Sequence, residues 1–139
     1  MLIESIVVPN KISTQSVRIT LNLGSKLMAG RILCKISSFE TQMMNVWTKG
    51  QRHEFRKLIS KICQWLELHE DQLKGHVSES VAQVMLFLVC GKLGISKKDF
   101  VQNLKPNVKA KRNLPKIENI KKLHCYGLLK KVFRENVGV

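Results

Sequence analysis

The N-terminal third of the chain alternates between apolar and polar positions, which is the pattern of a β-strand. Residues 16–23 are the clearest case, and their apolar face consists of Val17, Ile19, Leu21 and Leu23. Successive side chains of a strand point to opposite faces, so this spacing predicts a half-buried strand. Residues 2–8 are rich in β-branched side chains and stop at Pro9, which favours a second strand at a sheet edge.

Residues 31–37 carry a pattern that two structures would satisfy. Ile32, Cys34 and Ile36 alternate with other residues, as they would in a strand. A helix over residues 25–36 would also place Ile32 and Ile36 on one face. The alternation favours the strand, and the three segments together predict a small N-terminal antiparallel sheet.

The apolar spacing changes to a helical period after residue 37. Ser37 and Glu40 form a capping-box pattern at the start of a predicted short helix that ends near Gly50. Its apolar residues are four apart: Phe39, Met43 and Trp47. A longer helix is predicted over residues 51–74, where apolar side chains recur every three or four positions: Phe55, Leu58, Ile59, Ile62, Cys63, Leu66 and Leu73.

Residues 81–90 are apolar at every position except Gln83. A helix that is apolar all around lies at the centre of a core, and this segment is too short to cross a bilayer. Gly94 is expected to end this central helix. Ser96 and Asp99 have the spacing that opens the next one.

The C-terminal part is predicted to be a basic linker and a basic amphipathic helix. Residues 105–115 contain two prolines and four cations without an apolar period, and Pro115 suits the first turn of a helix over residues 116–139. One apolar face of that helix holds Ile117, Ile120, Leu123 and Tyr126, and the opposite face holds Leu128, Leu129, Val132 and Phe133. This change at Gly127 indicates a kink, or a helix held between its own domain and another surface.

These elements predict an α+β fold, with a small N-terminal antiparallel sheet followed by a predominantly helical bundle. Residues 1–104 would form a compact domain, joined through the basic linker at 105–115 to the C-terminal helix at 116–139. No apolar run reaches the roughly 18 residues of a membrane span, and the first residues lack the layout of a signal peptide. We therefore expect an intracellular protein, cytoplasmic or nuclear, that is not secreted.

Motifs for catalysis and metal binding are incomplete. His53 and His69 each precede a glutamate, as in zinc proteases, but neither is followed by the second histidine of that motif. The four cysteines are too far apart for a zinc site and are expected to be reduced, packed thiols: Cys34, Cys63, Cys90 and Cys125. The sequence thus predicts no catalytic residue, no metal, no cofactor and no small-molecule substrate.

Positive charge is the strongest functional signal. The chain has 24 Lys and Arg against 10 Asp and Glu, and residues 91–139 alone hold 13 basic and 3 acidic residues. The candidate nucleic-acid-binding residues in this part are Lys97, Lys98, Lys105, Lys109, Lys111, Arg112, Lys116, Lys121, Lys122, Lys130, Lys131 and Arg134. A second basic group lies on the long predicted helix: Lys49, Arg52, Arg56, Lys57 and Lys61.

A dense cationic segment attracts polyanions and releases their counterions on binding, and nucleic acid is the commonest such partner. Aromatic residues make up only 6% of the chain, and no helix-turn-helix, RNP-type or zinc-finger pattern occurs. The sequence predicts binding of RNA or DNA mainly through the phosphate backbone. The role would be regulatory or accessory, as in small basic viral accessory proteins. The alternative without a function is a solvated basic surface that keeps the protein soluble.

Two other function classes use the same residues. A peripheral membrane or matrix-type protein would bind anionic lipid through these cations, and a protein–protein interaction module would dock a partner on the apolar face. That partner interface would consist of Leu128, Leu129, Val132 and Phe133. A second copy of the chain is the simplest partner, which predicts a homodimer.

Overall fold

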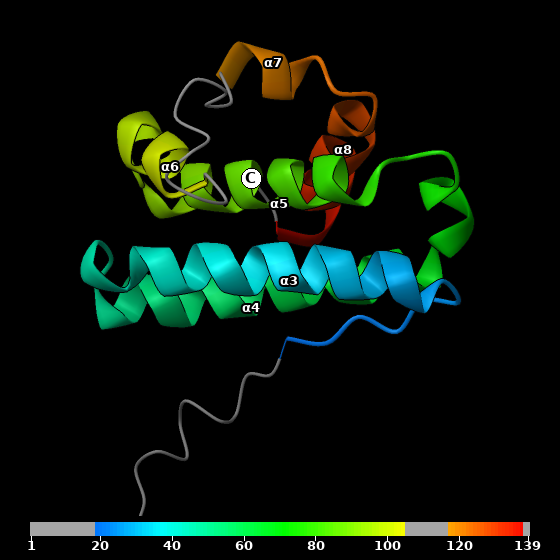
Figure 1. Ribbon diagram of the computed structural model, residues 1–139, viewed down its shortest axis with the longest axis horizontal. Coiled ribbons are helices and arrows are strands. Elements are labelled where there is room, and N and C mark those ends of the chain that lie inside the picture. Colours follow the sequence, from blue (N-terminus) through cyan, green and yellow to red (C-terminus); the bar gives the residue numbers. More distant parts are fainter. Residues whose placement is uncertain (1–18, 105–116, 138–139) are drawn as a thin grey trace, which may run out of the picture.

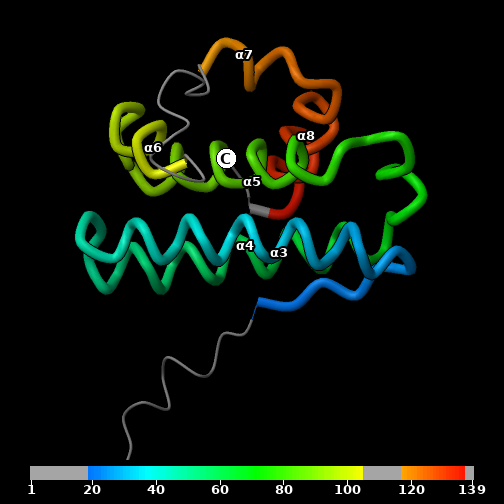
Figure 2. The backbone as a smooth tube through the Cα atoms, viewed as in Figure 1, coloured from blue at the N-terminus to red at the C-terminus, as the bar shows by residue number. Residues whose placement is uncertain are grey.

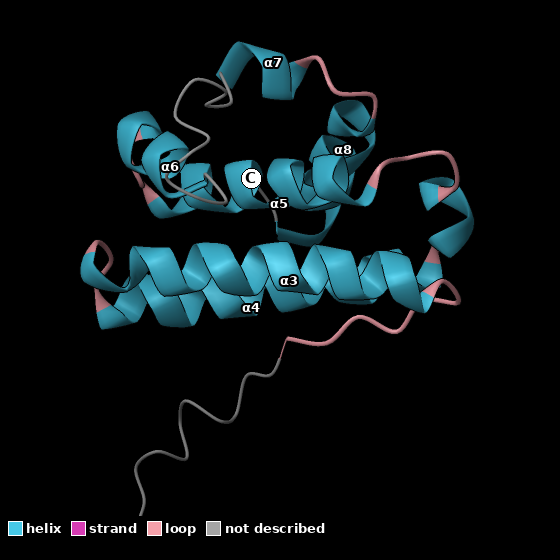
Figure 3. Cartoon of the chain, viewed as in Figure 1, coloured by secondary structure: helices cyan, strands magenta, loops and turns pink. Residues whose placement is uncertain are grey.

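The computed structural model describes residues 19–104 and 117–137, and every regular element in these ranges is helical (Figures 1 and 3). The α-helices are α3 (Lys26–Gln42), α4 (Lys49–Leu68), α5 (Ser78–Leu93), α6 (Lys97–Leu104), α7 (Ile117–Lys121) and α8 (Cys125–Val137). Two short 3-10 helices, η1 (Met43–Asn45) and η2 (Glu70–Leu73), follow α3 and α4. The predicted α+β fold is therefore wrong: no strand occurs in the described residues, and the strand predicted at 2–8 lies outside them.

Helix α3 replaces both the strand predicted at 31–37 and the short helix predicted after it. The Ser25 hydroxyl accepts a hydrogen bond from the Met28 amide and caps the first turn. The buried face consists of Ala29, Ile32, Ile36, Phe39 and Glu40. Residues four apart share a face in a helix and also in a strand, so Ile32 and Ile36 fit both patterns. Cys34, which alone distinguished them, is exposed. Ser37 lies inside the helix and not at its start.

Residues 19–23 keep the burial pattern of a strand but have no strand partner in the described part of the chain. Leu21 and Leu23 are buried, while Thr20 and Asn22 are exposed. The Asn22 amide donates to Glu67 Oε2 at 2.7 Å, and the Gly24 amide donates to Glu70 Oε2 at 2.7 Å. Carboxylates from the end of α4 and from η2 thus satisfy amides that a sheet would have paired.

Gly24 leaves room for the Glu70 carboxylate beside the backbone. A Cβ atom at position 24 would lie 2.8 Å from the Glu70 carboxylate oxygen, which is closer than real Cβ contacts. The absence of a side chain lets the backbone approach the carboxylate, and a larger residue would require the flexible end of the Glu70 side chain to shift.

Helix α4 begins with a reciprocal cap. The Thr48 hydroxyl accepts from the Gln51 amide at 3.1 Å, and Gln51 Oε1 accepts from the Thr48 amide at 2.9 Å. This capping box satisfies two amides that have no partner within the helix. The helix ends at Leu68, and η2 covers most of the remainder of the helix predicted over residues 51–74.

Helix α5 is the centre of the fold, as the sequence predicted. It packs against α3, α4, α6, α7 and α8. Its C-terminal cap, Gly94, has φ 77°, and the Ile95 amide donates back to the Cys90 carbonyl at 3.0 Å. A left-handed residue is readily supplied by glycine, so Gly94 ends the helix as predicted. The Ser96 hydroxyl then accepts from the Asp99 amide at 3.1 Å at the start of α6.

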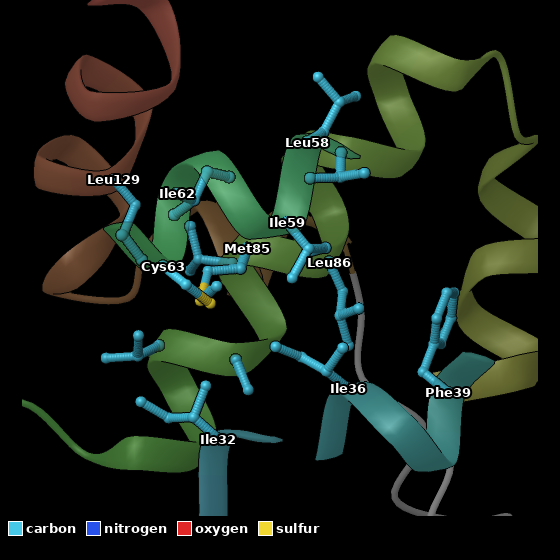
Figure 4. Close-up of a cluster of buried hydrophobic side chains, with 14 of the residues drawn as sticks. Ile32, Ile36, Phe39, Leu58, Ile59, Ile62, Cys63, Met85, Leu86 and Leu129 are labelled. Atoms are coloured by element: carbon cyan, nitrogen blue, oxygen red, sulfur yellow. The ribbon is translucent and has the colours of Figure 1, made fainter. Parts of the chain in front are cut away.

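The core joins the inward faces of these helices (Figure 4). Ile36 and Phe39 come from α3, Ile59 and Ile62 from α4, and Leu86 from α5. The C-terminal helices contribute to the same core, with the buried residues Ile120, Cys125, Leu129, Val132 and Phe133. The described part of the C-terminal region is therefore packed into the bundle.

The single C-terminal helix predicted over 116–139 is two helices. Figure 2 shows the chain turning between α7 and α8. The Lys122 amide donates to Asn119 and the Tyr126 amide donates to Leu123, both to the third residue back. These turns redirect the chain, so each helix buries its own apolar face. This explains the change of face, and Gly127 itself lies exposed inside α8.

Candidate functional site

The predicted nucleic-acid-binding cations come from several separate elements. Seven of them belong to the described residues, and all seven are exposed: Lys97, Lys98, Lys121, Lys122, Lys130, Lys131 and Arg134. The other five lie outside the described residues: Lys105, Lys109, Lys111, Arg112 and Lys116. Three of the seven project from α8, more than from any other element that carries these predicted residues.

Helix α8 has one buried and one cationic side. The buried side holds Cys125, Leu129, Val132 and Phe133, spaced by four, three and one. That spacing keeps all four on the face that packs against α4 and α5. Lys130, Lys131 and Arg134 are left on the outward side.

The burial of α8 overturns the exposed apolar patch expected from the sequence. Leu129, Val132 and Phe133 are core residues, and Leu128 is half-buried against the core. They cover the chain's own core because the turn before α8 points them inward. An interface that required these four side chains at the surface is therefore absent from this conformation.

A groove runs between α5 and α8. It has a volume of about 280 Å³ and is lined by Leu88, Gly91, Lys92, Lys130, Phe133 and Arg134. Leu88 and Phe133 supply its apolar floor. At Gly91 an added Cβ would meet no atom within 4 Å, so the missing side chain leaves space along the groove.

The lining of the groove is positively charged. Lys92 comes from the last turn of α5, and Lys130 and Arg134 come from α8. The lining contains no acidic side chain, and within residues 19–104 and 117–137 none of these three cations lies within ion-pair distance of a carboxylate. Three cations around an apolar floor favour an occupant that carries negative charge next to a hydrophobic group.

Lys130 also touches the aromatic core. Its Nζ atom lies 5.8 Å from the centroid of the Tyr126 ring, within the range of a cation–π contact. Tyr126 in turn lies 6.4 Å from Phe87, measured between ring centroids, and Phe87 lies 5.7 Å from Phe100. A row of rings therefore leads from Phe100 through Phe87 and Tyr126 to the Lys130 ammonium group.

Two of the five residues of the second basic group, Arg52 and Arg56, have a structural role. Glu40 is buried in α3, and its carboxylate accepts hydrogen bonds from Arg56 Nε at 2.6 Å and Nη2 at 3.0 Å, and from Arg52 Nε at 3.3 Å. Burial alone would raise the pKa of Glu40, but the hydrogen bonds and charges of Arg56 and Arg52 outweigh it and hold the pKa below its ordinary value. Hydrogen bonding to Glu40 raises the pKa of Arg56.

This ion-pair cluster escaped the sequence reasoning, although a signal for it exists. Glu40 follows Ile36 by four positions and thus falls on an apolar stripe, and two arginines four apart occur on the next helix. A lone carboxylate on a buried face requires cationic partners. Lys49, Lys57 and Lys61 remain as exposed cations of α4.

A larger cavity of about 460 Å³ lies beside α3, α5 and α6. Three of its polar side chains are engaged with one another or with nearby backbone. Lys35 pairs with Glu79 at 3.5 Å, and Asn103 Nδ2 donates to the Asp99 carbonyl at 2.8 Å. Compared with the groove between α5 and α8, this cavity offers less uncompensated charge to a ligand.

The cysteines are packed as the sequence suggested, with one exception. Cys63, Cys90 and Cys125 are buried, and burial raises the pKa of Cys63 and of Cys90 to about 12. Cys34 is exposed on α3. Within the described ranges, no three His, Cys, Asp or Glu side chains gather where they could hold a metal ion.

Comparison with known proteins gives no relative from which a function could be transferred. No family model, curated protein or solved structure matches the chain. Among the helices of the described residues, none combines the length and apolar character that crossing a membrane requires.

Proposed function

We propose that this protein binds nucleic acid, RNA or DNA, through phosphate contacts made by the outward side of α8 and by Lys92 of α5, in a regulatory or accessory role. The observation that carries the proposal is the set of cations around the groove, which no acidic residue compensates in the described part of the chain. Neighbouring like charges repel, and a polyanion that binds them removes this repulsion while its own counterions are released.

The burial of α8 favours a polyanion in solution over a lipid bilayer. A peripheral membrane protein of the predicted kind would insert Leu129, Val132 and Phe133 into the interface. These side chains are in the core, so insertion would require α8 to leave the bundle. Phosphate binding needs only the exposed cations and leaves the fold unchanged.

The salt dependence of binding tests the proposal. Each phosphate contact on duplex DNA contributes about −0.9 to the slope of log affinity against log salt. Lys130, Lys131 and Arg134 are changed together to glutamine, and binding of the nuclease-treated protein to duplex DNA is titrated with salt. We expect the magnitude of the slope to fall by about 2.7 if all three residues touch phosphates.

The matched control changes Lys49, Lys57 and Lys61 to glutamine, which removes the same charge from the exposed side of α4. This variant should keep the wild-type slope. Its three lysines make no phosphate contacts in the proposed site, and salt screens the effect of their charge at a distance. Equal slopes for the two triple variants would refute a site on α8. No binding by the monodisperse wild-type protein at low salt would refute nucleic-acid binding.

A further inference from the structure

We propose that the groove between α5 and α8 accepts an unpaired nucleobase, so that the protein prefers single-stranded nucleic acid to duplex. This inference rests on the proposed function and concerns the same surface. The groove adds an apolar floor, which phosphate binding alone does not use. A ligand that fills it must bring a compact hydrophobic group between its negative charges.

The shape of the groove suits one ring system. Its volume of about 280 Å³ is near the lower end of pockets that hold small ligands, roughly 300–1,000 Å³. Leu88 and Phe133 form the floor, and the open space beside Gly91 gives a flat group room to lie against α5. An unpaired base has such a face available, whereas the faces of duplex bases are covered by their neighbours.

The rim supplies the matching charges. Lys92 and the two α8 cations stand on different helices, so they can meet phosphates on both sides of an inserted base. Lysine binds phosphate as a point charge, and the planar guanidinium of Arg134 can bind phosphate or stack on a base. A flexible single strand can adopt this geometry at a lower unstacking cost than a duplex.

An acidic protein segment with one apolar side chain would have related chemistry, but the surrounding charge favours the nucleic acid. Lys121, Lys122 and Lys131 are further exposed cations of α7, α8 and the turn between them, outside the groove lining. A long polyanion can contact these cations as well, which a short acidic segment cannot.

Filling the groove without changing its charge separates base insertion from phosphate binding. Gly91→Leu places a side chain into the open space, and the helix tolerates it because an added Cβ meets no neighbouring atom. Gly30→Leu is the matched control, since Gly30 is an exposed glycine of α3 whose added Cβ also meets no atom within 4 Å. The probes are labelled oligodeoxythymidylate, which forms no internal pairs, and a DNA duplex of the same length.

We expect Gly91→Leu to weaken binding of the oligodeoxythymidylate about tenfold, which corresponds to the loss of one stacked base. Duplex binding and its salt slope should stay at the wild-type values, and Gly30→Leu should change neither probe. Unchanged binding of the single strand, or equal weakening of both probes, would overturn base insertion and leave the proposed function standing. Failure of the wild-type protein to bind either probe would instead refute the proposed function. If neither DNA probe binds but a labelled polyglutamate binds the wild type and not Gly91→Leu, the occupant of the groove is an acidic protein.

Discussion

The Glu40 carboxylate joins α3 to α4, and its replacement by glutamine tests how much this contact stabilises the bundle. Glutamine keeps the size of the side chain but removes the charge. In the native protein the carboxylate accepts two hydrogen bonds from Arg56 and one longer bond from Arg52. The change therefore weakens three charge-assisted hydrogen bonds at once without opening a cavity.

The expected loss follows from burial and geometry. Breaking a buried ion pair by removing one partner costs about 3–5 kcal/mol. The arginine side chains here are 29% exposed for Arg56 and 41% for Arg52, so water recovers part of the loss. We expect Glu40→Gln to lower the free energy of unfolding by about 2–3 kcal/mol, Arg56→Gln by about 2 and Arg52→Gln by less than about 1 kcal/mol. Domains of this size are stabilised by only about 5–15 kcal/mol in total.

Chemical denaturation is measured for these single variants and for two double variants, one combining Glu40→Gln with Arg56→Gln and one combining it with Arg52→Gln. The comparison gives the coupling energy of each pair. Coupling should be larger for Glu40 with Arg56 than for Glu40 with Arg52, because Arg56 binds with two nitrogen atoms. Glu79→Gln is the control, since its carboxylate is exposed and pairs with Lys35 at 3.5 Å. It should change stability by no more than about 0.5 kcal/mol. A loss below about 0.5 kcal/mol for Glu40→Gln, or equal coupling for both pairs, would refute this reasoning.

The same carboxylate should make stability depend on acidity. Its pKa is lower in the folded protein than in the unfolded chain, so its contribution is complete above the unfolded value of about 4.3 and is lost as the pH falls through the folded value. Denaturation midpoints measured below about pH 4.3 should fall more steeply for the wild type than for Glu40→Gln. If the midpoints of the two proteins fall in parallel, another group causes the loss of stability in acid.

Two further predictions concern the core and the thiols. Leu86→Asp should abolish cooperative thermal unfolding, because an unpaired carboxylate in the core costs several kcal/mol. Leu68→Asp, at an exposed position, should leave the melting temperature nearly unchanged. A folded Leu86→Asp protein would show that the centre of the core lies elsewhere. A thiol reagent should modify Cys34 rapidly in the native protein and the three buried cysteines only after unfolding. Loss of the fast phase in Cys34→Ser identifies the site, and more than one fast thiol would contradict the packing described for α4, α5 and α8.

The sequence predicted the central helix because residues 81–90 are apolar on every side. Its end was predictable because Gly94 readily adopts the left-handed conformation that ends a helix. The prediction failed in the first third because apolar periodicity reports burial and not hydrogen bonding. Leu21 and Leu23 are buried as a strand face would be, yet their neighbours' amides bind carboxylates. The partner of a backbone amide depends on residues 45 and 46 positions away, which no local pattern contains.

The candidate site shows the same division. Lys130 and Arg134 could be predicted, because charge density is a local property of the sequence. Lys92 was missed, since its position beside them results from the packing of α8 on α5. The apolar residues of α8 were predicted to be exposed because the change of apolar face at Gly127 also fits a helix held between its own domain and another surface. The alternative, a kink, is nearer to the structure, in which the chain turns between α7 and α8.

The attachment of residues 19–24 has a consequence for the order in which the protein opens and closes. The amides of Asn22 and Gly24 are held by side chains from the end of α4 and from η2. These contacts can form only after the end of α4 and η2 have taken their places in the bundle. The segment should therefore dock late in folding and detach first under native conditions, as a small cooperative unit. Amide hydrogen exchange at Asn22 and Gly24 should then proceed through local opening, well before exchange of the amides in the middle of α5.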